Sequence, residues 1–158
     1  TRLSCAHFDT GDFFWERTDP PFQEKTPVEA RQAALRSALD GAGKWVLSGS
    51  LCGWGDVFIP QLDLVIFISL DQDVRMERLR RREIQRYGEA ALAPGGVMHK
   101  TYVDFIEWAA AYDTAGMSQR SRLVHETWLA DMPVPVIRLD GAMATDEQVE
   151  SVIAFSGR

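Results

Sequence analysis

Short apolar runs alternate with amphipathic stretches along the chain. The apolar runs predict strands at 3–8, 45–47, 64–70 and 134–139. Such an alternation of strands and helices is typical of an α/β protein with a mostly parallel sheet. The run 64–70 is apolar at almost every position, which predicts a strand buried on both faces. Pro135 lies within the last run and cannot donate to a ladder, so we expect that strand at a sheet edge.

Start signals and apolar spacing locate the helices between these strands. Thr26, Pro27 and Glu29 predict a helix start, with Thr26 as the cap and Glu29 closing a capping box. Thr145 and Gln148 predict the start of the last helix in the same way. The inward-facing stripes that we expect are Val28, Leu35 and Leu39; Met76 and Leu79; Tyr102, Phe105, Ile106 and Ala109; Leu123, Val124, Thr127 and Trp128; and Val149, Val152 and Ile153.

Composition and charge narrow the classes of function. With 158 residues, 46% of them hydrophobic, the chain is long enough for one domain with its own core. A net charge of -6 argues against general binding to nucleic acid, whose partners are usually basic. The sequence has no apolar run of membrane-spanning length and no visible signal peptide. We therefore expect a cytoplasmic protein without a nucleic-acid or membrane partner.

The carboxyl ends of the strands are where ligands bind in sheets of this kind. Asp9 and Asp12 follow the first strand, and two carboxylates three residues apart can bind Mg²⁺ through water or accept a proton from a substrate hydroxyl. The alternative is that both side chains only cap a turn or a helix. After the second strand, the loop 48–55 holds three glycines, which let a backbone approach a ligand closely or simply form turns. Trp54 in that loop is either a substrate wall or a packing residue.

Arginines gather at two other places. Arg78 and Arg82 are four residues apart, so they share a helix face and both could reach one phosphate, unless the face is merely solvated and balanced by glutamates. Arg120 and Arg122 precede or open a helix, where cations oppose the helix dipole unless an anion shares the site. His125 on that helix is interpreted as a surface histidine rather than a catalytic one.

The stretches 7–15, 45–56 and 78–82, supported by 94–99 and 138–141, together resemble the nucleoside-monophosphate-kinase-like branch of P-loop proteins. That branch includes adenylate, shikimate and gluconate kinases, and the resemblance points in particular to a bacterial group called adenylate kinase-like or AAA-type ATPases. It spans nearly the whole chain. It implies one three-layer α/β/α domain over 1–158, with a parallel sheet in the order 2-3-1-4-5. Residues 83–117 would be a lid-like insertion, of which 86–100, rich in Gly and Pro, is expected to be a mobile loop.

The resemblance also implies roles for individual residues. Asp9 and Asp12 would lie near Mg²⁺ and the phosphoryl acceptor, although Gly11 stands where this group is expected to carry a third acid. Arg78 and Arg82 would lead into the lid over ATP. The remaining implied contacts are Ser48, Gly49, Ser50, Trp15, Arg17, Lys25 and Trp54 with the acceptor; Arg120 and Arg122 with the transferring phosphates; and Asp140 and Gly141 with the adenine.

The expected function is therefore an ATP- and Mg²⁺-dependent phosphotransferase with a small-molecule acceptor. The sequence departs from the family in one respect, because Gly-x-x-x-x-Gly-Lys-Ser/Thr does not occur in it. In the family this loop and the central strand precede the residues aligned with Thr1, and we expect about 20–30 further residues there. Without that strand, two strand pairs would remain. The alternatives are a nucleotide-binding or NTPase module without kinase activity, and a remnant that persists as an interaction protein.

Overall fold

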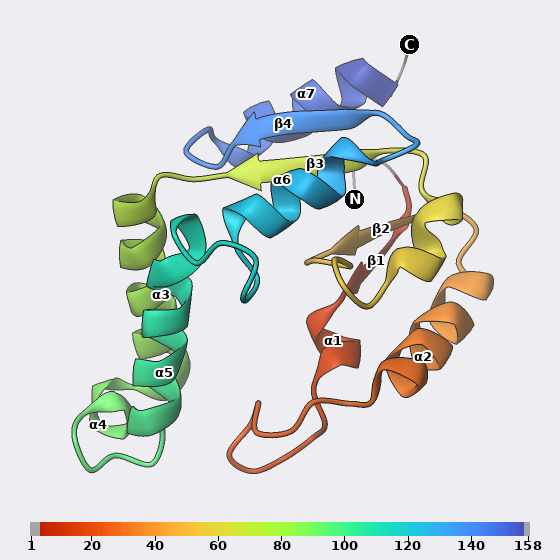
Figure 1. Cartoon of the computed structure of the whole chain (residues 1–158). Coiled ribbons are helices and arrows are strands. Elements are labelled where there is room, and N and C mark those ends of the chain that lie inside the picture. The colour runs from red at the N-terminus through yellow and green to blue at the C-terminus, as the bar shows by residue number, and fades with distance from the viewer. Residues whose placement is uncertain (1–3, 157–158) are drawn as a thin grey trace. The chain divides into compact units, whose positions relative to one another are not determined.

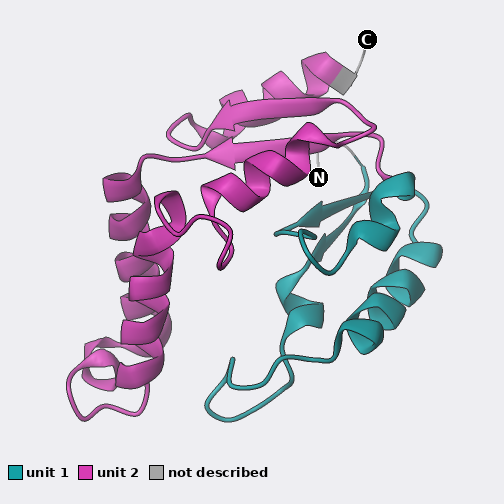
Figure 2. Ribbon diagram, in the orientation of Figure 1, with its two compact units in different colours: residues 1–61 teal, residues 62–158 magenta. Residues whose placement is uncertain are grey.

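The structure of the chain, a computed structural model, describes residues 4–156 (Figure 1). Its strands and helices follow one another in the alternating order that the apolar pattern predicts, and every strand pairing is parallel. The α/β class is thereby confirmed. The chain divides into two compact units, Thr1–Gln61 and Leu62–Arg158 (Figure 2). Each unit is described by itself below.

Unit 1 is built on a parallel pair of short strands, β1 (Ala6–Asp9) and β2 (Trp45–Ser48). The predicted strand at 45–47 is confirmed with one added residue, whereas the predicted strand at 3–8 begins only at Ala6, and Leu3 lies outside the described residues. Asp9 pairs with Ser48 in the register, so two predicted site residues lie side by side at the carboxyl end of the pair. The unit also contains α1 (Gly11–Phe14), α2 (Val28–Asp40) and the 3-10 helix η1 (Asp56–Gln61).

The core of unit 1 forms where α2 and the chain after β2 supply large apolar side chains. Leu35 and Leu39 are buried as predicted, but Val28 is exposed. The buried side chain on the first turns of α2 is instead Arg31, whose guanidinium lies 4.0 Å from the centre of the Phe14 ring. An arginine over an aromatic face is stabilised there by the ring quadrupole. The other buried apolar residues of the unit are Leu51, Trp54 and Phe58.

The start of α2 differs from the predicted capping box. Pro27 is the N-cap residue rather than the first helical one, and no described side chain caps the helix. The Thr26 carbonyl instead accepts a hydrogen bond of 2.7 Å from Arg31 Nε. A buried guanidinium must find acceptors, and this requirement decides the local geometry over the capping preference of Thr26.

Unit 2 is built on a second parallel pair, β3 (Val65–Ser69) and β4 (Val136–Asp140). The predicted burial of β3 on both faces is wrong, because Ile68 is 54% exposed and Ile66 is exposed as well. Among residues 4–156, β3 pairs with β4 only, and the ring contact of Phe67 with His125 shows that a helix covers the face opposite to Ile68.

The last strand begins later than predicted. β4 starts at Val136, so Pro135 precedes the strand and does not lie within it. Its carbonyl still accepts a hydrogen bond of 3.0 Å from Val65 N, which fits a residue that has an acceptor but no donor.

The helices of unit 2 depart from prediction mainly in the segment 86–100. It is not a loop throughout, since α3 continues to Tyr87 and a short helix, α4, follows. Leu92 and Met98 are buried, and His99 Nδ1 lies 2.8 Å from the Leu92 carbonyl. The stretch whose Gly and Pro content predicted a loop therefore contains a short helix and two buried side chains. The helices are α3 (Gln72–Tyr87), α4 (Glu89–Leu92), α5 (His99–Ala110), η2 (Ala111–Asp113), α6 (Arg122–Ala130) and α7 (Thr145–Ser156).

Two helix details also correct the sequence-based prediction. In α6 the buried residue is Leu129, while Leu123 of the predicted stripe is 52% exposed. The start of α7 uses Glu147, whose Oε2 accepts a hydrogen bond of 3.2 Å from Ala144 N. This is the glutamate half of a capping box, one residue earlier than predicted, since Ala144 has no side-chain oxygen to complete it. Gln148 instead donates to the Met143 carbonyl.

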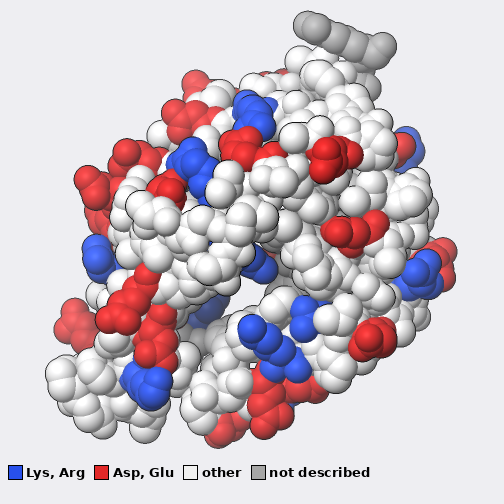
Figure 3. Space-filling view, in the orientation of Figure 1, with Lys and Arg blue, Asp and Glu red and all other residues white. Residues whose placement is uncertain are grey.

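Acidic and basic side chains are interspersed on the face of the molecule that Figure 3 shows.

No helix among the described residues combines the length and the apolar character that crossing a bilayer requires.

Candidate functional site

The carboxyl end of the β1–β2 pair brings Asp9, Ser48 and His7 together in unit 1. Asp9 Oδ2 accepts a hydrogen bond of 2.7 Å from Ser48 Oγ, and Asp9 Oδ1 accepts one of 2.7 Å from Gly11 N. His7 Nε2 lies 3.1 Å from the same Ser48 Oγ. The carboxylate is thus held in one orientation by a side chain and by the first backbone N–H of α1. We call this group of three residues the Asp9 edge.

The loop after β2 packs directly against the chain that follows the Asp9 edge. Thr10 N donates a hydrogen bond of 2.8 Å to the Ser48 carbonyl, and the Thr10 side chain is buried. Gly49 has a φ of +100°, and a Cβ placed on it would lie 1.8 Å from Thr10 Oγ1. The glycine predicted to allow a close backbone approach therefore makes that approach to the protein itself.

We expect Gly49→Ala to lower the free energy of unfolding by about 2 kcal/mol or more, because it combines a strained φ with a clash against a buried threonine. Chemical denaturation measures this change. Gly41→Ala is the matched control, since Gly41 has a φ of -95° and no described atom lies within 4 Å of the position that its Cβ would take. Equal stability of the two variants would contradict the account of this loop.

The other predicted residues of unit 1 lie in and around an aromatic cluster. Trp15 pairs with Lys25 in an isolated antiparallel bridge, and its ring contacts Phe14 at 5.1 Å between centroids. Trp54 is buried, and its indole N–H donates to the Ser50 carbonyl at 2.9 Å, so it packs inside unit 1 and does not form an open wall. Asp12 on α1 and Arg17 in the following loop are exposed.

In unit 2 the carboxyl ends of β3 and β4 form a cavity of about 340 Å³, which we call the strand-end cavity. Asp140 lines it, as the sequence analysis expects of a strand-end residue, and Arg122 lines it from the first position of α6. Arg78 Nη1 donates a hydrogen bond of 2.8 Å to the Gly141 carbonyl. The structure therefore brings together Arg78 and the 140–141 turn, which the sequence analysis assigned to the same ligand. The lining residues are Ser69, Leu70, Asp71, Val74, Arg122, Asp140 and Ala142.

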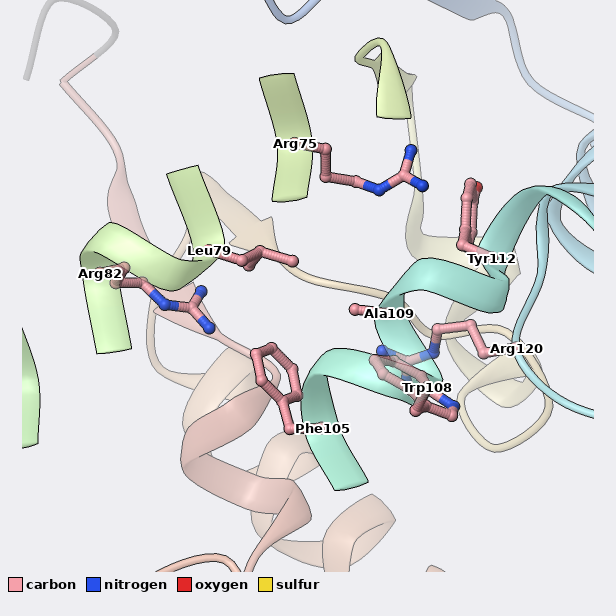
Figure 4. A pocket seen from close by; sticks show the side chains of 8 residues that line it. All are labelled: Arg75, Leu79, Arg82, Phe105, Trp108, Ala109, Tyr112 and Arg120. Carbon is pink, nitrogen blue, oxygen red and sulfur yellow. The ribbon is translucent and has the colours of Figure 1, made fainter. Parts of the chain in front are cut away.

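A second cavity in unit 2, of about 230 Å³, lies between α3 and α5 (Figure 4). We call it the arginine–aromatic cavity. Arg82 and Arg120 of the predicted site line it, whereas Arg78 does not, so Arg78 and Arg82 of α3 contact different partners. The lining residues are Arg75, Leu79, Arg82, Phe105, Trp108, Ala109, Tyr112 and Arg120.

Six of these residues were not predicted as site residues. Leu79, Phe105 and Ala109 were assigned only to core stripes, and the sequence analysis gave no role to Arg75, Trp108 and Tyr112. A signal for them exists in the spacing. Arg75, Leu79 and Arg82 are separated by four and three residues, which places them on one helix face. The residues contributed by α5 and η2 follow the same period: Phe105, Trp108, Ala109 and Tyr112.

Asp113 joins the two cavities by an ion triad. Its Oδ2 accepts a hydrogen bond of 2.8 Å from Arg75 Nη2, and its Oδ1 accepts one of 2.6 Å from Arg122 Nε. Burial alone would raise the pKa of Asp113, but the hydrogen bonds and charges of Arg75 and Arg122 outweigh it and lower the pKa below the usual value. Two arginines predicted or found at the sites are thus fixed by one carboxylate.

Tyr112 and His125 form a neighbouring neutral pair. Tyr112 Oη lies 2.8 Å from His125 Nδ1. Burial, and then the charge of Arg120, lower the pKa of His125, while burial raises the pKa of Tyr112. Tyr112 Oη and His125 Nδ1 share this hydrogen bond, so His125 has a structural contact and not only a surface position.

Replacing Asp113 by asparagine should lower the free energy of unfolding by about 1–2 kcal/mol at pH 7, allowing for partial exposure of the triad. Because the native pKa of Asp113 is depressed, this contribution is present above the unfolded pKa, about 3.9, and is lost as the pH falls through the native value. Denaturation at pH 7 and near pH 3 tests the sign: the difference between wild type and variant should shrink in acid. Asp104→Asn, in an exposed i,i+4 pair with Lys100, is the control and should change stability by less than about 0.5 kcal/mol.

Fold and sites together define a mixed α/β protein with parallel strand pairs and two cavities in unit 2, one lined by three arginines and the other by Arg122 with Asp71 and Asp140. No family model and no solved structure matches the chain. It is 42% identical over 154 residues to the Bacillus subtilis (strain 168) protein YqaC, described as an uncharacterized protein, across 98% of this chain and 84% of YqaC. The chain belongs to the same family as YqaC.

Proposed function

We propose that the protein is an ATP- and Mg²⁺-dependent phosphotransferase of the P-loop kinase type, acting on a small hydroxylated or phosphorylated acceptor. The observation that carries the proposal is the strand pairing. In a sheet with the strand order 2-3-1-4-5, strand 1 is the central strand. If strand 1 is left out, two parallel pairs remain: strands 2 and 3, and strands 4 and 5. The chain forms two parallel pairs that follow one another in the same way along the sequence, β1–β2 and then β3–β4.

The Asp9 edge supports the assignment of a catalytic carboxylate. Asp9 lies at the carboxyl end of β1, and each of its oxygens accepts one hydrogen bond from the protein. A carboxylate oxygen has two lone pairs, so each oxygen can accept a further bond from a metal-bound water or from an acceptor hydroxyl. Either use would suit phosphoryl transfer, in which the protein mainly aligns the reactants and balances charge.

The described residues fit Mg²⁺ in one way. They contain no group of three or more His, Cys, Asp or Glu placed to hold a metal ion. Mg²⁺ commonly keeps several waters and uses only one or two carboxylates together with the phosphates of its nucleotide. We assign Asp9 to this role, with Asp12 as a second candidate through water.

For ATP, the described residues of unit 2 supply arginine side chains but no glycine-rich phosphate-binding loop. Arg78 and the 140–141 turn meet through one hydrogen bond, and Arg122 lines the strand-end cavity beside them. We assign this cavity to the nucleotide. The motif Gly-x-x-x-x-Gly-Lys-Ser/Thr does not occur in the sequence, so the nucleotide contacts that we propose here are those of unit 2.

A nucleotide-binding or NTPase module without transfer to an acceptor is the second candidate. It is favoured by the pairing of the arginines, since Arg122 is bound to Asp113 and Arg82 to Glu83. If these guanidinium groups stay in their ion pairs when a ligand binds, they can position a nucleotide. They would not move with the phosphoryl group during its transfer.

One assay separates the two candidates. The protein produced from its complete gene is incubated with ATP, Mg²⁺ and a panel of nucleoside monophosphates, sugars and shikimate-like acids, and products are detected by mass spectrometry. The proposal predicts one acceptor class that gains a phosphoryl group and an equivalent amount of ADP. ADP without a phosphorylated acceptor supports the second candidate. Neither ADP nor a phosphorylated product would contradict the phosphotransferase.

A further inference from the structure

The arginine–aromatic cavity has a composition that packing between two helices does not require. Its walls carry three arginines and three aromatic rings, and no carboxylate of the described residues lines it. In Figure 4 the side chains of Arg75 and Arg82 extend from α3 toward the rings contributed by α5 and η2. A gap between helices that only needed filling would be lined by aliphatic side chains, which bury no charge.

Each arginine of the cavity lies over a different ring. The guanidinium carbons of Arg75, Arg82 and Arg120 lie 5.0, 5.6 and 5.8 Å from the ring centroids of Tyr112, Phe105 and Trp108, respectively. Cation–π contacts of this kind hold a guanidinium in place without neutralising its charge. Three guanidinium groups, each against an aromatic ring, therefore line the cavity.

Two carboxylates that do not line the cavity form ion pairs with two of its arginines. Glu83, which is buried, holds Arg82 through Nε at 3.0 Å and Nη2 at 2.9 Å, both to the same oxygen. Asp113 holds Arg75 through Nη2. Each of these two arginines is thus held by one carboxylate, and this fixes the directions of its remaining N–H groups.

Arg75 has one such group unused. Its Nε is buried and has no hydrogen-bond partner within the described residues, while Nη1 and Nη2 donate to the Leu70 carbonyl and to Asp113. A buried donor without an acceptor costs free energy, so packing alone does not favour this placement of Arg75.

The size of the cavity limits what can enter. Its volume of about 230 Å³ is below the range of about 300–1,000 Å³ that is usual for drug-sized ligands. One ring, or two fused rings, with a single acidic group is the corresponding class of molecule. Rings of the ligand can stack on Phe105 and Trp108, and guanidinium groups bind carboxylate and phosphate in their own plane.

We propose that the arginine–aromatic cavity binds a planar aromatic molecule that bears one anionic group, a carboxylate or a phosphate. The inference deepens the proposed function. That this ligand is the phosphoryl acceptor rests on that proposed function. Binding itself needs neither ATP nor Mg²⁺, so its test is independent of the transfer reaction.

The test uses four small probes and isothermal titration calorimetry without nucleotide. Benzoate and phenyl phosphate carry a ring with either anionic group, cyclohexanecarboxylate has the charge without the aromatic ring, and inorganic phosphate has no ring. We expect benzoate or phenyl phosphate to bind at least tenfold more tightly than cyclohexanecarboxylate and inorganic phosphate. Which of the two aromatic probes binds more tightly identifies the anionic group.

Two variants locate the binding. Trp108→Leu removes the ring but keeps an apolar side chain, and Arg120→Gln removes the charge; Trp108 and Arg120 are exposed enough for both changes to leave the fold intact. Each should weaken the aromatic probe at least about tenfold. Arg81→Gln, on the same α3 but exposed and outside the lining, is the matched control and should change affinity less than twofold.

Three results would overturn the inference: no saturable binding of either aromatic probe, equal affinity for cyclohexanecarboxylate, or an affinity that Trp108→Leu and Arg120→Gln leave unchanged. If the acceptor assay gives a phosphorylated product and any of these results is also found, the proposed phosphotransferase function stands and only the ligand class of the cavity is contradicted. If an aromatic anion binds but no product forms, the ligand class stands and the phosphotransferase function is contradicted.

Discussion

Replacing Asp9 by asparagine is expected to slow ATP-dependent phosphoryl transfer at least about 100-fold, the usual range when a catalytic base is removed. Asparagine keeps the shape of the side chain, and its oxygen can still accept the bond from Gly11 N that Asp9 Oδ1 accepts at 2.7 Å. It removes the negative charge that would face Mg²⁺ or the acceptor hydroxyl. The rate is measured with the acceptor that gives the greatest wild-type turnover.

The same preparation provides the control for folding. Asp9 is exposed, so the variant should unfold within about 0.5 kcal/mol of the wild type. Asp40→Asn, at the exposed end of α2, is the matched charge change and should leave the rate unaltered. An Asp9→Asn protein that is folded and retains more than about a third of the wild-type rate would remove Asp9 from the proposed chemistry.

Replacing Phe58 by alanine is expected to cost about 3–5 kcal/mol of stability, a large share of what a domain of this size possesses. Phe58 is 0% exposed in η1, and the guanidinium of Arg36 lies 5.4 Å from its ring centroid. The substitution leaves a cavity and removes that cation–π contact. Denaturant unfolding, followed by a probe within unit 1, measures the loss.

Val57 provides the control for Phe58, because it precedes Phe58 on the same 3-10 helix and is 47% exposed. Val57→Ala should change the free energy of unfolding by less than about 1 kcal/mol. If Phe58→Ala were no more costly than Val57→Ala, the core of unit 1 would not be organised around η1 and α2 as described.

The strands could be predicted because their apolar runs are short and bounded by turn residues. The runs at 45–47 and 64–70 correspond to β2 and β3 within one or two residues. The burial of β3 could not be predicted from its run, since a continuous apolar stretch indicates two covered faces only when other elements cover them. Ile68 is exposed because, in the part of the chain described, Phe67 and not Ile68 faces a covering helix.

The segment 86–100 shows a second limit of local pattern. Pro94, Gly95 and Gly96 are loop-forming residues, and they do lie between helices. Leu92 and Met98 of the segment are nevertheless buried, through tertiary contacts that no local pattern contains. Glycine and proline content therefore located the turn correctly but missed the helices on either side of it.

Site residues were easier to find at strand ends than on helices. Asp9 and Ser48 follow from the rule that ligands meet the carboxyl ends of strands, and the register places them side by side. Arg78 and Arg82 were grouped by their spacing of four, but side-chain direction sends Arg78 to Gly141 and Arg82 to Glu83. Phe105 was taken for a packing residue because the spacing of a core stripe and that of a cavity wall are the same.

The central claim, that the protein handles MgATP, is tested most directly by calorimetric titration of MgATP into the protein expressed from its complete gene. The account predicts saturable binding of one nucleotide per chain, with AMP and inorganic phosphate unable to reproduce its affinity. A titration that shows no saturable heat at millimolar MgATP, with a protein that unfolds cooperatively, would contradict it.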